Sequence, residues 1–217
     1  MSISASQVKE LRERTGVGIM DCKQALQESK GDVDEAVKVL RRMGKAKVAK
    51  KATREASEGR VEAYVHLGGK IAVMLELNCE TDFVAKSDAF IELARDIAMH
   101  IAASNPRFIR REDVDEASIA EERELFRAQA EAEGKPANIV DKIVDGKIER
   151  HLAENVLYEQ PFVKDPDHTV GDLLADAIQR IGENIVVGRF VRFALGENDA
   201  QVVASSRGAQ RGSQEAA

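Results

Sequence analysis

The segment IAVMLELNCETDFVAKSDAFIELARDIAMHIAAS, residues 71–104, changes its hydrophobic period about halfway along. In its first part every second residue is a large aliphatic one, which is typical of a β-strand with one buried face. In its second part apolar residues recur at helical spacing until the Asn-Pro pair at 105–106 ends the run. The segment therefore predicts a strand followed by one long helix that begins at Thr81 and Asp82 and carries Phe83 in its first turn.

A second alternating run lies just before this segment. Val61, Ala63 and Val65 alternate with polar residues, and the glycine turn LGGK at 67–70 separates the two runs. Two alternating runs joined by such a turn predict a β-hairpin. A further run rich in Val and Phe, NIVVGRFVRFALG at 184–196, predicts another strand. With the helices between these runs, the fold class is α+β with a small antiparallel sheet.

The N-terminal residues predict three short helices. Gly16, Gly18 and Gly31 separate runs with helical spacing, and Asp32 is placed to cap the third helix. A three-helix domain of roughly 45 residues is marginal by itself because it buries little surface. Met20 lies off the apolar stripe of its helix, so it is either a soft contact for a partner helix or an ordinary surface methionine.

Two helices with heavily charged outer faces are predicted after Arg111. Between Arg111 and Glu133 there are nine acidic and three basic residues with a thin apolar stripe. A Gly-Lys-Pro turn follows at 134–136, and residues 139–152 carry a matching apolar stripe. Two narrow complementary stripes joined by a short turn predict an antiparallel helical hairpin that forms an arm.

Charge is distributed unevenly along the chain. The 217 residues carry a net charge of −6, yet residues 1–53 hold twelve Lys and Arg against seven Asp and Glu. The run RRMGKAKVAKKATR, residues 41–54, has seven basic residues and no acidic one. It is either a nucleic-acid footprint, or a solvated linker or a patch for an acidic protein partner. Its lack of aromatic residues and the acidic remainder of the chain favour the linker or the patch. Residues 198–217 are rich in Ser, Gly, Ala and Gln, which predicts disorder.

Few groups in the sequence are suited to catalysis. No GxxxxGK[ST] loop, HExxH or GxSxG motif is present, and the four histidines have no metal-ligand spacing. Cys22 and Cys79 form no CxxC pair, which indicates free thiols in a reducing compartment. No apolar run approaches the roughly 20 residues of a membrane span, and no targeting segment is evident. We therefore expect a cytoplasmic binding protein that is not an enzyme and uses no metal or cofactor.

Two segments resemble the signature regions of a known family. LRERTGVGIMDCKQAL (11–26) and LELNCETDFVAKSDAF (75–90) are similar to those of bacterial elongation factor Ts. The later segments HIAASNPRFI, QPFVKDP and TVGDLL resemble the later part of the same family, so the resemblance extends to about residue 197. It implies a guanine nucleotide exchange factor that binds elongation factor Tu in its GDP-bound and nucleotide-free states.

The resemblance also implies a domain organisation, which agrees in order with the helices, hairpin and arm above. The expected parts are an N-terminal three-helix domain similar to ubiquitin-associated domains (UBA-like) with its basic linker at 1–53, an α+β core at 54–110 and 159–197, a coiled-coil arm at 111–158, and a disordered tail at 198–217.

The family further implies which residues meet elongation factor Tu. Thr81, Asp82, Phe83 and Val84 would bind near the magnesium ion of its G domain. Phe83 would wedge between two partner helices, and Asp82 would disturb the surroundings of the Mg²⁺ ion. From local sequence alone, Phe83 has a competing role as an apolar residue that packs onto the sheet.

A second set of implied contacts comes from the N-terminal module. Ile19, Met20 and Lys23 would dock on the G domain, with Lys51 at the adjoining junction. His66, in the segment AYVHLGGK, is similar to a histidine in the second core repeat of longer family members, which implies a contact on the phosphate side of the nucleotide.

The chain has one core unit, whereas longer family members have two related repeats. A homodimer joined through the sheet of residues 60–77 and 185–195 would supply two cores, and an open sheet edge rich in Val and Ile favours such pairing. The competing hypothesis is a ribosome- or RNA-associated protein that uses residues 41–54. If the family resemblance holds, neither membrane binding nor direct nucleic-acid binding is expected.

Overall fold

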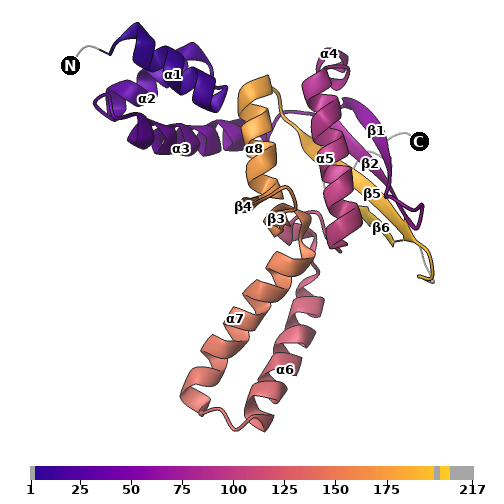
Figure 1. Cartoon of the computed structure of the whole chain (residues 1–217). Helices are drawn as coiled ribbons and strands as arrows, with labels where there is room; N and C mark the ends of the chain where they lie inside the picture. Colours follow the sequence, from indigo (N-terminus) through magenta and orange to yellow (C-terminus); the bar gives the residue numbers. More distant parts are fainter. Residues whose placement is uncertain (1–2, 198–200, 206–217) are drawn as a thin grey trace. The chain divides into compact units, whose positions relative to one another are not determined.

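The computed structural model describes residues 3–197 and 201–205, and Figure 1 shows its helices and strands. The chain forms two units that alternate along the sequence. Unit 1 comprises Met1–Gly59, Asn78–Lys86 and Leu173–Val186. Unit 2 comprises Arg60–Leu77, Ser87–Asp172 and Val187–Ala217. Helix α8, Val170–Ile181, therefore has residues in both units.

Three helices begin unit 1, namely α1 (Ala5–Thr15), α2 (Ile19–Glu28) and α3 (Val33–Lys51). Ser4 caps α1, and Asp32 caps α3 as predicted, accepting a hydrogen bond from the Glu35 N–H at 2.9 Å. The apolar faces of the helices meet in one cluster made of Leu11, Val17, Cys22, Ala25, Leu26, Ala36, Val39 and Leu40. The three predicted helices are present, and Gly16 ends the first with a left-handed φ of 68°.

The third helix is longer than the sequence predicts. Helix α3 continues to Lys51, so most of the basic run 41–54 is helical. Lys, Arg, Ala and Met all have high helix propensity, which explains the extension. Gly44 within the run is buried, and a Cβ atom there would collide with the side-chain amide of Gln179 on α8. The Gln179 side chain therefore packs directly over Gly44.

The main sheet has four strands in the order β1-β2-β5-β6. Their bounds are Glu58–Val65, Ile71–Cys79, Val186–Ala194 and Gln201–Ala204. The predicted hairpin is confirmed as β1 and β2, which are closed by a hydrogen bond from the His66 N–H to the Ile71 carbonyl oxygen. Helix α5, Asp88–Ser104, covers one face of the sheet (Figure 1), where Arg192 of β5 donates to the Ala102 carbonyl oxygen. The predicted α+β class is confirmed.

The transition from strand to helix differs from the predicted single long helix. Strand β2 ends at Cys79, the short helix α4 spans Asp82–Ala85, and α5 starts separately. The Ser87 hydroxyl caps α5 by accepting from the Phe90 N–H at 3.4 Å, which fixes a new helix start. The single-helix prediction is therefore wrong, and Phe83 lies on α4 rather than in the first turn of α5.

Strand β6 corrects the predicted disorder of residues 198–217. Gln201–Ala204 pair antiparallel with β5, with Phe190 opposite Val203. Val203 is buried, so this short strand adds to the core. Four residues next to Ser and Ala are too few to give a periodic strand signal. The rest of the predicted tail, residues 198–200 and 206–217, lies outside the described residues.

The sheet face opposite α5 is apolar and exposed. The large exposed side chains on the strands are Val61, Val65, Met74, Phe193 and Val202. An ion pair between Arg189 and Glu76 at 2.7 Å, and the pairing of Val191 with Val202, connect β2, β5 and β6 on this face. Because β5 lies between β2 and β6, residues 185–195 offer no open sheet edge, and that part of the dimer argument is wrong.

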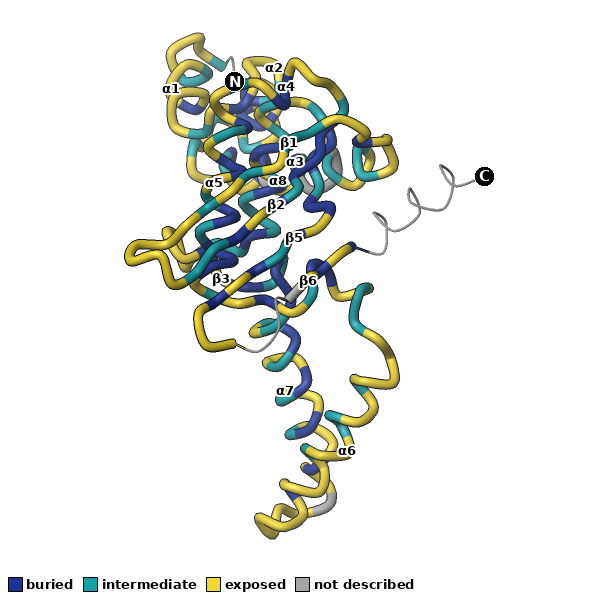
Figure 2. The backbone as a smooth tube through the Cα atoms, turned by 90° about the vertical axis from the view of Figure 1, so that its right-hand side faces the viewer, coloured by how far each residue is buried: buried dark blue, intermediate teal, exposed yellow. Residues whose placement is uncertain are grey.

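Helices α6 (Glu116–Ala132) and α7 (Ala137–Asn155) lie side by side and antiparallel, as predicted (Figure 1). The buried residues of the two helices form a narrow line, and Figure 2 shows short buried stretches on α7 beside a mostly exposed α6. That line is the cluster of Ala130, Val140, Val144, Ile148, Leu152 and Val156. Next to the hairpin, Arg111 donates to both Glu149 and Glu159 at 2.7 Å, which ties α7 to the segment that follows it.

Short elements complete the description. Two 3-10 turns, η1 (Arg111–Asp113) and η2 (Leu157–Glu159), flank the helical hairpin. Strands β3 (Pro161–Phe162) and β4 (Asp165–Thr169) form a separate two-stranded sheet. In the part of the chain that the structure describes, no helix has both the length and the apolar character needed to cross a membrane.

Candidate partner-binding site

The α4 segment presents Phe83 to solvent on a capped turn. The Thr81 hydroxyl caps the helix by accepting from the Val84 N–H at 3.4 Å. Val84 and Ala85 are buried, so the opposite side of this single turn faces outward. The phenyl ring of Phe83 lies on that side and is 80% exposed. The structure therefore does not pack Phe83 onto the sheet.

Asp82 lies next to this ring and carries a charge partner of its own. Its Oδ2 accepts a hydrogen bond from the Lys86 ammonium at 2.7 Å, and both side chains are exposed. The hydrogen bond and the positive charge of Lys86 lower the pKa of Asp82 from its ordinary value. Asp82 is thus ionised at neutral pH, directly beside an exposed aromatic ring.

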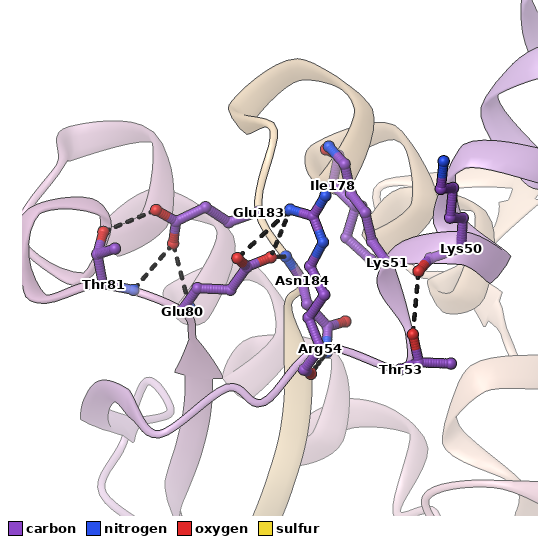
Figure 3. A network of polar contacts seen from close by, with 9 residues as sticks. All are labelled: Lys50, Lys51, Thr53, Arg54, Glu80, Thr81, Ile178, Glu183 and Asn184. Atoms are coloured by element: carbon purple, nitrogen blue, oxygen red, sulfur yellow. Dashed lines mark hydrogen bonds and ion pairs between the residues drawn. The ribbon is translucent and has the colours of Figure 1, made fainter.

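Glu183, in the loop after α8, holds the chain just before α4. One carboxylate oxygen accepts from the backbone N–H groups of Glu80 and Thr81, each at 3.1 Å. The other accepts from the Thr81 hydroxyl at 2.7 Å. Figure 3 shows these bonds converging on one carboxylate. The start of α4 is therefore fixed by a residue about a hundred positions away in the sequence.

Residues next to Glu183 and Thr81 form a second set of contacts. The Asn184 N–H donates to the Glu80 carboxylate at 2.7 Å, and the Asn184 side-chain amide donates to the Arg54 carbonyl oxygen at 2.7 Å. Arg54 also pairs with Glu80 at 3.5 Å (Figure 3). We call Arg54, Glu80, Thr81, Glu183 and Asn184 the α4 bracket. It joins the segment after α3, the end of β2 and the loop after α8.

Lys51 lies at the edge of this bracket, at the end of α3. Its ammonium donates to the Ile178 carbonyl oxygen at 3.4 Å, in the last turn of α8 (Figure 3). A cation there is favoured because unpaired carbonyls give the C-terminal end of a helix a partial negative charge. The structure therefore places Lys51 as a contact between two helices of unit 1.

The other predicted docking residues share the exposed side of α2. Ile19 is 53% exposed, Met20 is 73% exposed, and Lys23 is exposed as well. Cys22, between Met20 and Lys23, is buried in the helical cluster, so the two sides of α2 are clearly separated. Met20 and Ile19 form an apolar surface that the module does not need for its own packing.

His66 belongs to unit 2, at the turn of the β1–β2 hairpin. It is exposed, and its Nδ1 lies 3.1 Å from the Tyr64 hydroxyl. The structure thus groups Thr81, Asp82, Phe83 and Val84 on α4, and a second set on α2. Both sets belong to unit 1, whereas His66 belongs to unit 2.

The buried Cys79 thiol donates to the Thr81 carbonyl oxygen at 3.2 Å, and burial raises its pKa to about 11, which makes it a poor nucleophile. Among residues 3–197 and 201–205, no cluster of His, Cys, Asp and Glu could hold a metal ion.

The sequence did not reveal the bracket. Glu183 and Asn184 contact residues more than a hundred positions earlier, and a single Glu or Asn in a loop has no local pattern that marks it. By contrast, the Thr81 cap was visible as a helix-start signal.

Comparisons with known proteins give a consistent result. The family model described as Elongation factor TS matches residues 3–197. An elongation factor Ts of Carboxydothermus hydrogenoformans is 59% identical over 92% of this chain and 92% of its own length. One from Herpetosiphon aurantiacus is 58% identical over 91% of this chain and 100% of its own length. One from Thermoanaerobacter pseudethanolicus is 56% identical over 90% of this chain and 96% of its own length.

Proposed function

The chain belongs to the elongation factor Ts family, and on this premise we propose that it is a guanine nucleotide exchange factor for elongation factor Tu. It acts in the cytoplasm by binding the GDP-bound and nucleotide-free forms of that partner, without covalent chemistry. The observation that carries the proposal is the α4 segment, where an exposed Phe83 lies beside an ionised Asp82 on a fixed turn.

Phe83 supplies the apolar wedge. A ring that is 80% exposed in the free protein gains free energy when an apolar partner site covers it. Phe83 inserts between two helices of the G domain, while Thr81 and Val84 hold the turn beneath it. The single turn of α4 limits how far the ring moves on binding, which reduces the entropy lost there.

Asp82 acts on the magnesium site of the partner. Mg²⁺ requires near-ideal octahedral geometry and bridges the nucleotide phosphates to the protein. A carboxylate brought close to that ion competes for its ligands, so a small displacement weakens the binding of GDP. In the free protein the Asp82 carboxylate is exposed and is paired only with the exposed ammonium of Lys86 among the ion pairs on α4, so a partner can reach it.

Release of the factor follows from thermodynamic linkage. If this protein lowers the affinity of elongation factor Tu for GDP, guanine nucleotide lowers the affinity of elongation factor Tu for this protein by the same factor. Incoming GTP therefore displaces the factor at the end of the exchange cycle.

The N-terminal module provides a second docking surface. Ile19, Met20 and Lys23 bind the G domain through the exposed side of α2, and Lys51 supports the junction by its contact with α8. His66, exposed at the hairpin turn, reaches the phosphate side of the nucleotide site.

We also propose that the chain forms a homodimer through the sheet of residues 60–77 and 185–195. The support is now the exposed sheet face rather than a sheet edge. Monomers rarely leave several large apolar side chains exposed on one sheet face, and a twofold axis lets the same face cover itself. A dimer would present two copies of the single core.

An RNA-binding function for the basic run is less well supported. Arg42 pairs with Glu28, Lys51 donates to Ile178, and Arg54 joins the α4 bracket, so three of the basic residues already have partners within the protein.

Complex formation tests the proposal. Mixed with nucleotide-free elongation factor Tu, the protein should co-elute in size-exclusion chromatography, and excess GDP should separate the two. Met20→Ala should weaken the complex, because it removes an exposed apolar contact on α2. Failure to co-elute, together with RNA binding that falls steeply with salt, would instead favour the RNA-binding hypothesis.

A further inference from the structure

We propose that Glu183 is a positioning residue for nucleotide exchange, which acts by holding the start of α4 and thereby fixing Phe83. This inference rests on the proposed function of Phe83. Glu183 contacts the turn that carries the Phe83 ring.

The contacts of Glu183 are unusually concentrated. Its carboxylate accepts from two consecutive backbone N–H groups, those of Glu80 and Thr81, and from the Thr81 hydroxyl. The same hydroxyl caps α4 through Val84. One side chain therefore sets both the backbone path into α4 and the orientation of its cap.

Besides Glu183, the Cys79 thiol contacts this turn by donating to the Thr81 carbonyl oxygen at 3.2 Å. The exposed flank of α4 carries Phe83 and the exposed pair of Asp82 with Lys86. Exposed ion pairs contribute little to stability because water screens them. On the inner side, Val84 and Ala85 are small buried contacts. The polar contacts of the α4 bracket therefore restrain the turn that carries the ring.

The position of the turn matters because Phe83 must enter its site on the partner in one position and orientation. A mobile turn loses conformational freedom when the partner binds, and a small misplacement weakens contacts that act only in one geometry. Removing the Glu183 carboxylate should therefore slow exchange without unfolding the protein, since Glu183 is only partly buried.

Two substitutions separate the effect of the Glu183 hydrogen bonds from the effect of its charge, and a third is a control. Glu183→Ala removes every bond, and we expect about a five- to tenfold loss in catalysed GDP release from elongation factor Tu. In Glu183→Gln the amide oxygen accepts from both N–H groups and the NH₂ group donates to the Thr81 hydroxyl, so exchange should stay near the parent rate. Asp172→Ala is the matched control, because Asp172 accepts from the Thr169 N–H and hydroxyl at the start of α8.

The background of Phe83→Ala tests whether Glu183 acts through the ring. If it does, adding Glu183→Ala to Phe83→Ala should cause little further loss, because the positioned group is already absent. Equal losses in both backgrounds would overturn the inference. A Glu183→Gln protein as slow as Glu183→Ala would overturn it too, since the charge rather than the contacts would then matter.

A readout without the partner distinguishes this inference from the proposed function. Cys79 is buried and donates to Thr81, so loosening the turn should speed its alkylation by iodoacetamide in Glu183→Ala, while buried Cys22 in the helical cluster serves as the internal reference. We expect about a fivefold increase in the ratio of the Cys79 rate to the Cys22 rate in Glu183→Ala but not in Glu183→Gln, which removes the same negative charge from beside Cys79 and keeps the contacts. An equal increase in both variants would reflect the lost charge and would overturn the positioning role. An unchanged ratio would overturn the positioning role, whereas a parent protein that fails to release GDP would overturn only the proposed function.

Discussion

At Phe83, a packing role and a binding role predict different effects of truncation. The ring is 80% exposed, so Phe83→Ala should change the free energy of unfolding by less than about 0.5 kcal/mol. As an interface anchor its loss should slow catalysed GDP release by at least about tenfold. Thermal melting and fluorescent-nucleotide release measure the two effects separately.

Phe90 offers the matched control for that experiment. It is fully buried at the start of α5, so Phe90→Ala should lose about 3–5 kcal/mol of stability through lost burial and the cavity left behind. If Phe83→Ala melts as low as Phe90→Ala yet exchanges normally per folded molecule, Phe83 is a packing residue and the assignment is wrong.

His100 should make the stability of the protein depend on pH. It is fully buried, its Nδ1 accepts from the Val163 N–H at 3.3 Å, and its Nε2 lies 2.9 Å from the Gln160 side-chain oxygen. Burial lowers the pKa of His100 below its ordinary 6.5. The unfolded chain therefore binds a proton here at a higher pH than the folded one, so this stability is present above pH 6.5 and falls as the pH drops below it.

Chemical denaturation at several pH values tests this prediction. The parent should lose more unfolding free energy between pH about 7.5 and about 5.5 than His100→Gln, which cannot titrate. If the free energy of unfolding changed equally with pH in the parent and in His100→Gln, the buried imidazole would not resist protonation.

At the scale of secondary structure, the sequence was sufficient to predict an element where its apolar residues recur at a regular spacing. The β1–β2 hairpin, the three N-terminal helices and the α6–α7 hairpin follow from spacing and turn glycines. Contacts between residues that are far apart in the sequence could not be predicted in this way. The split between α4 and α5 depends on a single Ser87 cap, and the α4 bracket depends on Glu183, which is far from α4 in sequence.

Strand β6 gives a prediction at this scale. A chain that ends after Glu197 loses the pairing of β6 with β5 and exposes the surface that Val203 covers. We expect it to be less stable than a chain that ends after Ser205 by at least about 1 kcal/mol. Urea unfolding of the two truncated proteins measures the difference. Equal midpoints would mean that β6 adds nothing to the core.

At the scale of the whole molecule, the exposed sheet face predicts a dimer at micromolar concentration. Met74 is 54% exposed and Phe193 is 59% exposed, so replacing both with Glu should leave the fold intact but separate the subunits by repulsion and lost apolar contact. Light scattering gives the molecular mass. Leu125→Glu is the control, because Leu125 is 51% exposed on α6, away from the sheet. A parent protein that is monomeric with full exchange activity would contradict the dimer.

The most direct test of the central claim is the release of a fluorescent GDP analogue from elongation factor Tu as this protein is added. The release rate should rise with the concentration of the protein and then saturate, as expected for a factor that works through a bound complex. Phe83→Ala should lower the catalysed rate at least about tenfold. A release rate that stays at its spontaneous value at every concentration would contradict the proposal that this protein is a nucleotide exchange factor.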